Sequence, residues 1–95
     1  MMIVAGLIRV RPDQRETYLA TCVDVVEQAR AAAGCLDYVI GPDLVESDRI
    51  NIFERWESRA AVAAFRGDGP SDEQSAAMTG ASVAEYEIGE TRPLT

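Results

Sequence analysis

Glu54 and Trp56 are the residues whose types and spacing most clearly allow chemistry, because they lie two positions apart in the strand-like segment 50–58. Successive side chains of a β-strand point to opposite faces, so this segment divides into two sets. One face holds Ile50, Ile52, Glu54 and Trp56, and the other holds Asn51, Phe53, Arg55 and Glu57. Both faces mix polar and apolar residues, which is unusual for a strand that only supports a sheet. We therefore expect one face to line a pocket.

The absence of histidine limits the chemistry that this chain can perform. It removes the commonest general base, the commonest metal ligand and the usual proximal ligand of haem. Any reaction would have to use carboxylate, tyrosine, arginine, amide or indole groups. Cys22 and Cys35 match no zinc or redox motif in number or spacing, so we interpret them as reduced core residues.

Charge and hydropathy exclude several classes of partner. The formal charge is −7, and the nine basic residues, all arginine, are spread thinly along the chain. Nucleic acid and anionic membrane surfaces require clustered basic residues, so we expect neither as a partner. No segment approaches the roughly 18 consecutive apolar residues of a membrane span. Met1 is followed by a strand-like run instead of a signal peptide, so we expect a cytoplasmic location.

The hydrophobic pattern predicts four strands and three helical segments. The strands are expected at residues 2–10, 35–40, 50–58 and 82–88. A long helix is expected between an Asp13–Glu16 start signal and Gly34. Ser58 is expected to cap a short helix that ends near Gly67. A capping box at Ser71 and Gln74 predicts another helix up to Thr79, ended by Gly80.

This element order, β-α-β-β-α-β, predicts a ferredoxin-like α+β fold with a four-stranded antiparallel sheet and its helices on one face. The first strand is apolar on both faces, with Ile3, Ala5 and Leu7 on one side and Met2, Val4 and Ile8 on the other. Helices of the same chain can cover only one of these sets. Two sheets stacked about 10 Å apart would cover the other, so we predict a homodimer.

Two short motifs give the chain a resemblance to a known family. They are Gly34-Cys35-Leu36-Asp37-Tyr38 after the long helix and Phe53-Glu54-Arg55-Trp56-Glu57-Ser58 before the next. With these elements in place, the chain resembles the antibiotic biosynthesis monooxygenase family, whose fold is the dimeric α+β barrel. The resemblance runs from Ile3 to about Ile88, which implies a single domain of this type over residues 1–95.

The branches of that family differ in their functional residues. The resemblance implies that a haem-degrading member would carry Asn, Trp and His where this chain has Gly6, Phe65 and a position near Ser75, so we expect no haem. A quinone-forming member would carry Asn four residues before Trp56, where this chain has Ile52. The available amide, Asn51, is displaced by one residue and is expected on the opposite strand face.

The resemblance implies oxidation of an electron-rich aromatic molecule by O2 without a cofactor, with Glu54 and Trp56 as catalytic residues. Glu54 is the expected base, since partial burial raises the pKa of a carboxyl group. Trp56 would stack on the substrate, which is expected to be a small aromatic polyphenol, quinol or polyketide intermediate. The expected substrate-binding residues are Tyr38, Ile52, Phe65 and Tyr86.

Structural roles for the same residues remain open. Trp56 can be a plug between sheet and helix, and Glu54 can be an ion-paired carboxylate with Arg9 or Arg49 as its partner. Tyr38 and Tyr86 can be half-buried sheet residues. The alternative function is a non-redox member of the same fold, either a ligand-binding dimer or a cyclase- or isomerase-like enzyme that uses the same carboxylate.

Overall fold

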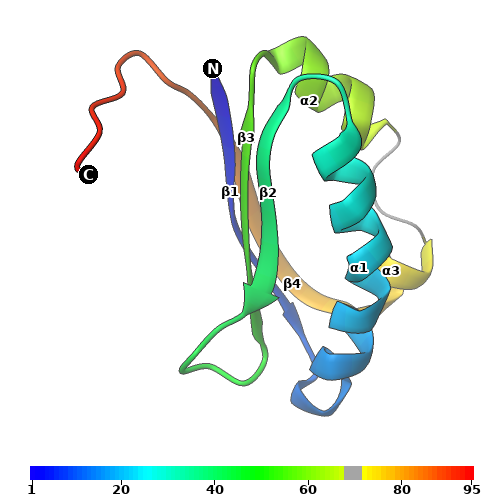
Figure 1. Cartoon of the computed structure of the whole chain (residues 1–95). Coiled ribbons are helices and arrows are strands. Elements are labelled where there is room, and N and C mark those ends of the chain that lie inside the picture. The colour runs from blue at the N-terminus through cyan, green and yellow to red at the C-terminus, as the bar shows by residue number, and fades with distance from the viewer. Residues whose placement is uncertain (68–71) are drawn as a thin grey trace.

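The described residues form one antiparallel sheet with three α-helices on one side (Figure 1). The computed structural model describes the backbone of residues 1–67 and 72–95, and the side chains of residues 1–67 and 75–95. The described strands are β1 (Met2–Val10), β2 (Cys35–Pro42), β3 (Arg49–Trp56) and β4 (Met78–Glu87). The described helices are the 3₁₀ turn η1 (Pro12–Gln14), α1 (Arg15–Ala31), α2 (Arg59–Arg66) and α3 (Asp72–Ala77).

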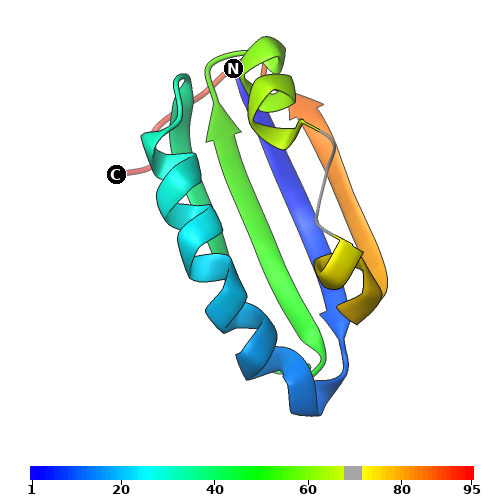
Figure 2. The same cartoon turned by 90° about the vertical axis from the view of Figure 1, so that its right-hand side faces the viewer.

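The strands are arranged in the order β2-β3-β1-β4, which confirms the predicted ferredoxin-like α+β fold. The helices lie in front of the sheet in Figure 2, with α1 running along its length and the shorter α2 and α3 over its two ends. The β1–β3 register is continuous from Met2 opposite Trp56 to Arg9 opposite Arg49. It places Glu54 opposite Val4, a buried residue, and thus confirms that Ile50, Ile52, Glu54 and Trp56 share the face under the helices.

Two groups of buried side chains form the core between sheet and helices. One surrounds Trp56 and contains Met2, Val4, Ala29, Tyr38 and Val62. The other surrounds Ile50 and contains Ile8, Val10, Tyr18 and Cys22. Cys22 is buried in the second group, as expected for a core residue, whereas Cys35 is half-buried beside the first group. The core is therefore built on the face that the alternating pattern of β1 and β3 selects.

The boundaries of three strands differ from the prediction. β3 spans Arg49–Trp56 and ends two residues before Ser58, which caps α2. β4 begins at Met78, so α3 ends at Ala77 and Gly80 lies within the strand. The reason is that β1 offers pairing partners along its whole length, with Arg9 opposite Gly80 and Val10 opposite Met78. β2 continues to Pro42, which a strand at the edge of the sheet tolerates because its outer side needs no N–H donor.

The predicted helix start signals had different outcomes. The Asp13–Glu16 signal was wrong as a cap, because Asp13 instead accepts a hydrogen bond from Arg11 at 3.1 Å. No side chain caps α1, which continues from the preceding 3₁₀ turn. The Ser58 cap is confirmed, since the Ser58 Oγ atom accepts a hydrogen bond from the Ala61 N–H at 3.1 Å. The Ser71–Gln74 capping box lies outside the described residues.

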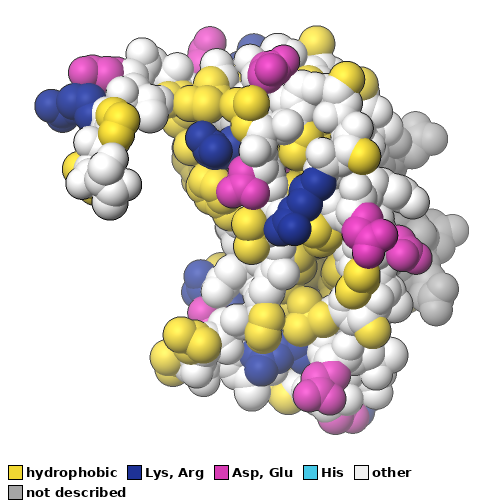
Figure 3. Space-filling model, viewed as in Figure 1, with side chains coloured by type: hydrophobic (Ala, Val, Ile, Leu, Met, Phe, Trp, Pro, Cys, Tyr) yellow, Lys and Arg dark blue, Asp and Glu magenta, His cyan; other side chains and the backbone are white. Residues whose placement is uncertain are grey.

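The face of the sheet turned away from the helices is apolar and uncovered. Figure 3 shows hydrophobic side chains along this side and on the loop after β2. Phe53, Val39 and Tyr86 are 38%, 42% and 52% exposed, and Leu44 in the loop is fully exposed. Asn51 also lies on this face, where it donates to Asp43 and accepts from Arg49. Its predicted place, opposite to that of Glu54, is confirmed.

Among the described residues, the longest helix, α1, is 17 residues long, and no helix combines the length and apolar character needed to cross a membrane.

Candidate functional site

Glu54 lies at the centre of the site, in the interior strand β3. Its neighbours across the sheet are Val4 on β1 and Tyr38 on β2. The side chain is completely buried under the helices. Trp56, two residues further along the same face, donates a hydrogen bond from Nε1 to Glu54 Oε1 at 2.9 Å. Strand alternation alone brings these two groups together, as the sequence predicted.

The second oxygen of Glu54 is bound by Arg66 from α2. Ser58 caps this helix, and Val62, Phe65 and Arg66 then follow at helical spacing on the side that faces the sheet. The Arg66 Nη2 atom lies 2.6 Å from Glu54 Oε2. The predicted partners Arg9 and Arg49 were wrong, because they lie on the opposite face, where they pair with acids of residues 43–48.

The electrostatics of the site are dominated by burial. Burial raises the pKa of Glu54, while the hydrogen bond from Trp56 and the charge of Arg66 lower it by less. Burial, reinforced by the nearby negative charge of Glu54, raises the pKa of Tyr38 to about 12. Tyr38 therefore keeps its phenolic proton at neutral pH and can act as a hydrogen-bond donor.

Three aromatic rings surround the carboxylate. The Trp56 and Phe65 rings are 5.3 Å apart between centroids, and Phe65 meets Tyr38 edge to face at 5.7 Å. Trp56 and Tyr38 are also edge to face, at 6.4 Å. This packing fixes the position of the indole that binds Glu54.

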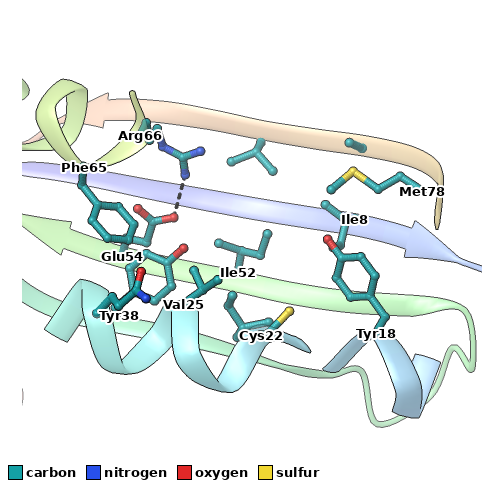
Figure 4. A pocket seen from close by; sticks show the side chains of 14 residues that line it. Ile8, Tyr18, Cys22, Val25, Tyr38, Ile52, Glu54, Phe65, Arg66 and Met78 are labelled. Atoms are coloured by element: carbon teal, nitrogen blue, oxygen red, sulfur yellow. Dashed lines mark hydrogen bonds and ion pairs between the residues drawn. The ribbon is translucent and has the colours of Figure 1, made fainter. Parts of the chain in front are cut away.

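A cavity of about 430 Å³ lies between the sheet and the helices, next to Glu54. Its volume is in the range of small-molecule sites, and its walls are mostly apolar. Glu54, Arg66, Phe65 and Tyr38 lie at one end, and Tyr18, Ile8 and Met78 lie at the other (Figure 4). The remaining lining residues are Cys22, Val25, Gln28, Ile40, Ile52, Ala81 and Val83.

The structure brings together four of the six predicted site residues at this cavity: Glu54, Tyr38, Ile52 and Phe65. Trp56 is completely buried behind Glu54 and does not line the cavity, so it is placed to position the carboxylate and not to stack on a ligand. Tyr86 lies opposite Ile3 on the uncovered face of the sheet, away from the cavity.

Sequence reasoning missed several residues of the cavity wall. The most consequential is Arg66, whose spacing from Val62 on α2 could have indicated that it faces the sheet. Tyr18 and Cys22 of α1 also line the cavity, and the sequence had indicated only a core position for Cys22. In the described part of the chain, no group of three or more Cys, Asp or Glu side chains is arranged to hold a metal ion.

Comparison with known proteins assigns the family. Residues 1–78 match the family model described as antibiotic biosynthesis monooxygenase. The chain belongs to this family. In this member of the family, Glu54 is bound by Trp56 and Arg66.

Two curated relatives match this chain over part of their length. An uncharacterised protein of Synechocystis is 36% identical over 61 residues, which are 64% of this chain and 42% of that protein. A Bacillus subtilis protein with the name "Putative monooxygenase YcnE" is 27% identical over 62 residues, which are 65% of each. The matched region thus spans less than two thirds of both relatives.

Solved structures of similar proteins show the same fold. A family member from Deinococcus radiodurans superposes with a TM-score of 0.83 at 20% identity, covering 100% of this chain and 99% of that one. The protein Rv0793 of Mycobacterium tuberculosis gives a TM-score of 0.78 at 23% identity, covering 97% and 98%. At these identities the likeness establishes the fold alone.

Proposed function

We propose that the cavity is the active site of a cofactor-independent monooxygenase that oxidises an aromatic polyphenol, quinol or polyketide intermediate with O2. The observation that carries this proposal is a completely buried carboxylate, Glu54, on the wall of an apolar cavity flanked by aromatic rings. A raised carboxyl pKa suits a base that must accept a proton from a weak acid.

The reaction would begin with transfer of a proton from the substrate to Glu54. The resulting phenolate or carbanion gives one electron to O2, and the substrate radical and superoxide then join through a new C–O bond. Loss of water from the protonated hydroperoxide breaks the O–O bond and leaves a carbonyl. One oxygen atom stays in the product and the other leaves in water. Tyr38, which remains protonated, is available to stabilise the developing oxyanion.

Oxygen uptake with anthrone and hydroquinone substrates tests the proposal. We expect substrate-dependent uptake in the native protein and at least about a hundredfold loss in Glu54→Gln, since a positioned base contributes roughly 10²–10⁴-fold. Glu85→Gln is the matched control, because Glu85 is an acid on the same sheet face that pairs with Arg59 outside the cavity. Equal turnover without O2 would favour the non-redox alternative, a cyclase- or isomerase-like enzyme. No turnover over a broad polyphenol panel would favour a ligand-binding protein.

We also propose that the protein is a homodimer in which the uncovered sheet faces stack. The support is the apolar face itself, with Val39, Phe53 and Tyr86 exposed. Phe53→Asp should produce monomers in analytical ultracentrifugation, while Val23→Asp should leave the dimer intact. Val23 is a matched control because it is an exposed apolar residue of α1, away from the sheet. A native protein that is monomeric at micromolar concentration would contradict this proposal.

The cytoplasmic location stays a prediction.

A further inference from the structure

The two partners of Glu54 differ in their freedom to move. Trp56 is completely buried in the core, and its ring is held by Phe65 and Tyr38. The Arg66 side chain is 41% exposed and belongs to the last residue of α2. Of the two hydrogen bonds that hold the carboxylate, the one from Arg66 is therefore the one that a ligand can replace.

Arg66 is also the residue of the cavity wall that can attract an anion. Among the described residues that line the cavity, it is the one cation, in a chain whose formal charge is −7. Its planar guanidinium can bind a carboxylate through two parallel hydrogen bonds. Because Glu54 and Arg66 lie side by side at one end of the cavity (Figure 4), an acidic group there competes directly with Glu54 for Arg66.

We propose that the ligand of this cavity is an aromatic carboxylate, and that its carboxylate takes Arg66 from Glu54 and leaves Glu54 free to accept a proton. The apolar walls contributed by Val25 and Ile52 accommodate the ring system. The inference rests on the proposed function in placing the ligand site at this cavity. It adds a substrate class and a way in which binding raises the proton affinity of Glu54, which acts as the base in the complexes where it is ionised.

This exchange, in which Arg66 leaves Glu54 and binds the ligand carboxylate, has a consequence for proton binding. The titratable groups that interact with Glu54 are Tyr38 and Cys35 on β2 and Arg66 on α2. Of the other charged residues on the packed elements, Arg30 on α1 donates to the Tyr38 carbonyl oxygen, and Arg59 on α2 pairs with Glu85 on β4. None of them supplies a second cation to the carboxylate once Arg66 has turned to the ligand. The ligand's negative charge and the lost ion pair both favour protonated Glu54. Binding should therefore take up a proton, and affinity should increase as pH falls through the pKa of Glu54 in the complex.

Binding of 2-naphthoate and 2-naphthamide tests the exchange, because the two probes share one ring system and differ in charge. By titration calorimetry at pH 6, we expect the native protein to bind 2-naphthoate about tenfold or more tightly than the amide. Arg66→Gln should bring this ratio close to one. Arg59→Gln is the matched control, since it removes the same charge from the same helix outside the cavity, and it should keep the ratio.

Calorimetry at pH 6 in MES and bis-Tris buffers, which differ in ionisation enthalpy, measures the proton uptake. We expect net uptake with 2-naphthoate in the native protein and none in Glu54→Gln. If Arg66→Gln does not fold, Arg66→Lys replaces it, because lysine keeps the charge but cannot form two parallel hydrogen bonds. A lower ratio of 2-naphthoate to 2-naphthamide affinity in Arg66→Lys supports the exchange, and an unchanged ratio contradicts it. A native ratio near one, a ratio that survives Arg66→Gln, or uptake that is equal in Glu54→Gln would also overturn the inference.

These measurements need no turnover. A protein that consumes oxygen without preferring the carboxylate probe refutes the exchange alone. A protein that shows the exchange and oxidises nothing refutes the proposed oxygenase function alone.

Discussion

Replacing Arg66 should lower the free energy of unfolding much more than replacing its partner Glu54. In Arg66→Gln the buried carboxylate loses its counterion, and breaking a fully buried pair in this way costs roughly 3–5 kcal/mol. The Arg66 side chain is 41% exposed, so water already weakens the interaction, and we expect about 2–3 kcal/mol at pH 7. In Glu54→Gln the charge that remains is the exposed one, and the amide oxygen can still accept the Trp56 hydrogen bond. That loss should stay below about 1 kcal/mol.

The loss of stability in Arg66→Gln should depend on pH, because the pKa of Glu54 differs between the folded and unfolded states. Burial raises the pKa of Glu54 in the folded protein above its unfolded value. Between these two values the folded state binds more protons, so its stability falls as pH rises through that range. Arg66→Gln removes an influence that lowers this pKa, which extends the range to higher pH. The variant should therefore lose more stability at pH 7 than at pH 5, by at most about 1.4 kcal/mol per pH unit for one proton.

Urea unfolding followed by far-UV circular dichroism measures both effects. The midpoint of Arg66→Gln should fall by roughly 1–2 M at pH 7 and by less at pH 5, for a slope typical of a small domain. All samples need one protein concentration, since self-association would shift the apparent stability. Equal losses at the two pH values, or a larger loss in Glu54→Gln than in Arg66→Gln, would refute the reasoning.

Two further predictions concern residues away from the Glu54 end of the cavity. Gly6→Ala should lower the free energy of unfolding by about 3 kcal/mol, because a Cβ there would lie 2.0 Å from the Ser82 carbonyl oxygen on β4. Thermal or urea unfolding measures this loss, and unchanged stability would show that the β1–β4 spacing can relax. The Asp43 carboxylate accepts hydrogen bonds from the Glu46 amide, the Asn51 side chain and the Val45 amide, which hold its pKa at about 2, below its unfolded value. Its stabilising effect on the loop is present above the unfolded pKa and is lost as pH falls towards 2. Amide hydrogen exchange at Val45 and Glu46, corrected for intrinsic rates, should therefore lose protection over that range in the native protein, and protection that persists at pH 2 would contradict this account.

The adjacency of Glu54 and Trp56 could be predicted from the sequence because it depends on strand alternation, which acts over two residues. The Glu54–Arg66 pair could not be predicted in the same way. It joins residues twelve apart and depends on how α2 lies over the sheet. Val62 and Arg66 share a helix face, but no local rule states which strand residue that face meets.

Tyr86 shows a different limit of sequence reasoning. Alternation along β4 groups Tyr86 with Ala84 and separates it from Val83, but it does not tell which group lies under the helices. The register decides this, because Val83 pairs with Gly6 on the helix side and Tyr86 pairs with Ile3 on the uncovered side. Both groups on β4 contain small and apolar residues, so the hydrophobic pattern does not indicate which group lies under the helices.

The cavity exists because small side chains and short helices coincide over one half of the sheet. Where β1 and β4 pair at its centre, the residues under the helices are Gly6, Ala81 and Val83. The helices on this side, α2 and α3, are only 8 and 6 residues long and lie towards opposite ends of the strands, whereas the 17-residue α1 lies over β2 (Figure 2). Protein interiors are normally close-packed, and larger residues at 81 and 83 would fill the space. Side chains that keep a volume open directly beside a buried carboxylate favour a ligand site over a packing defect.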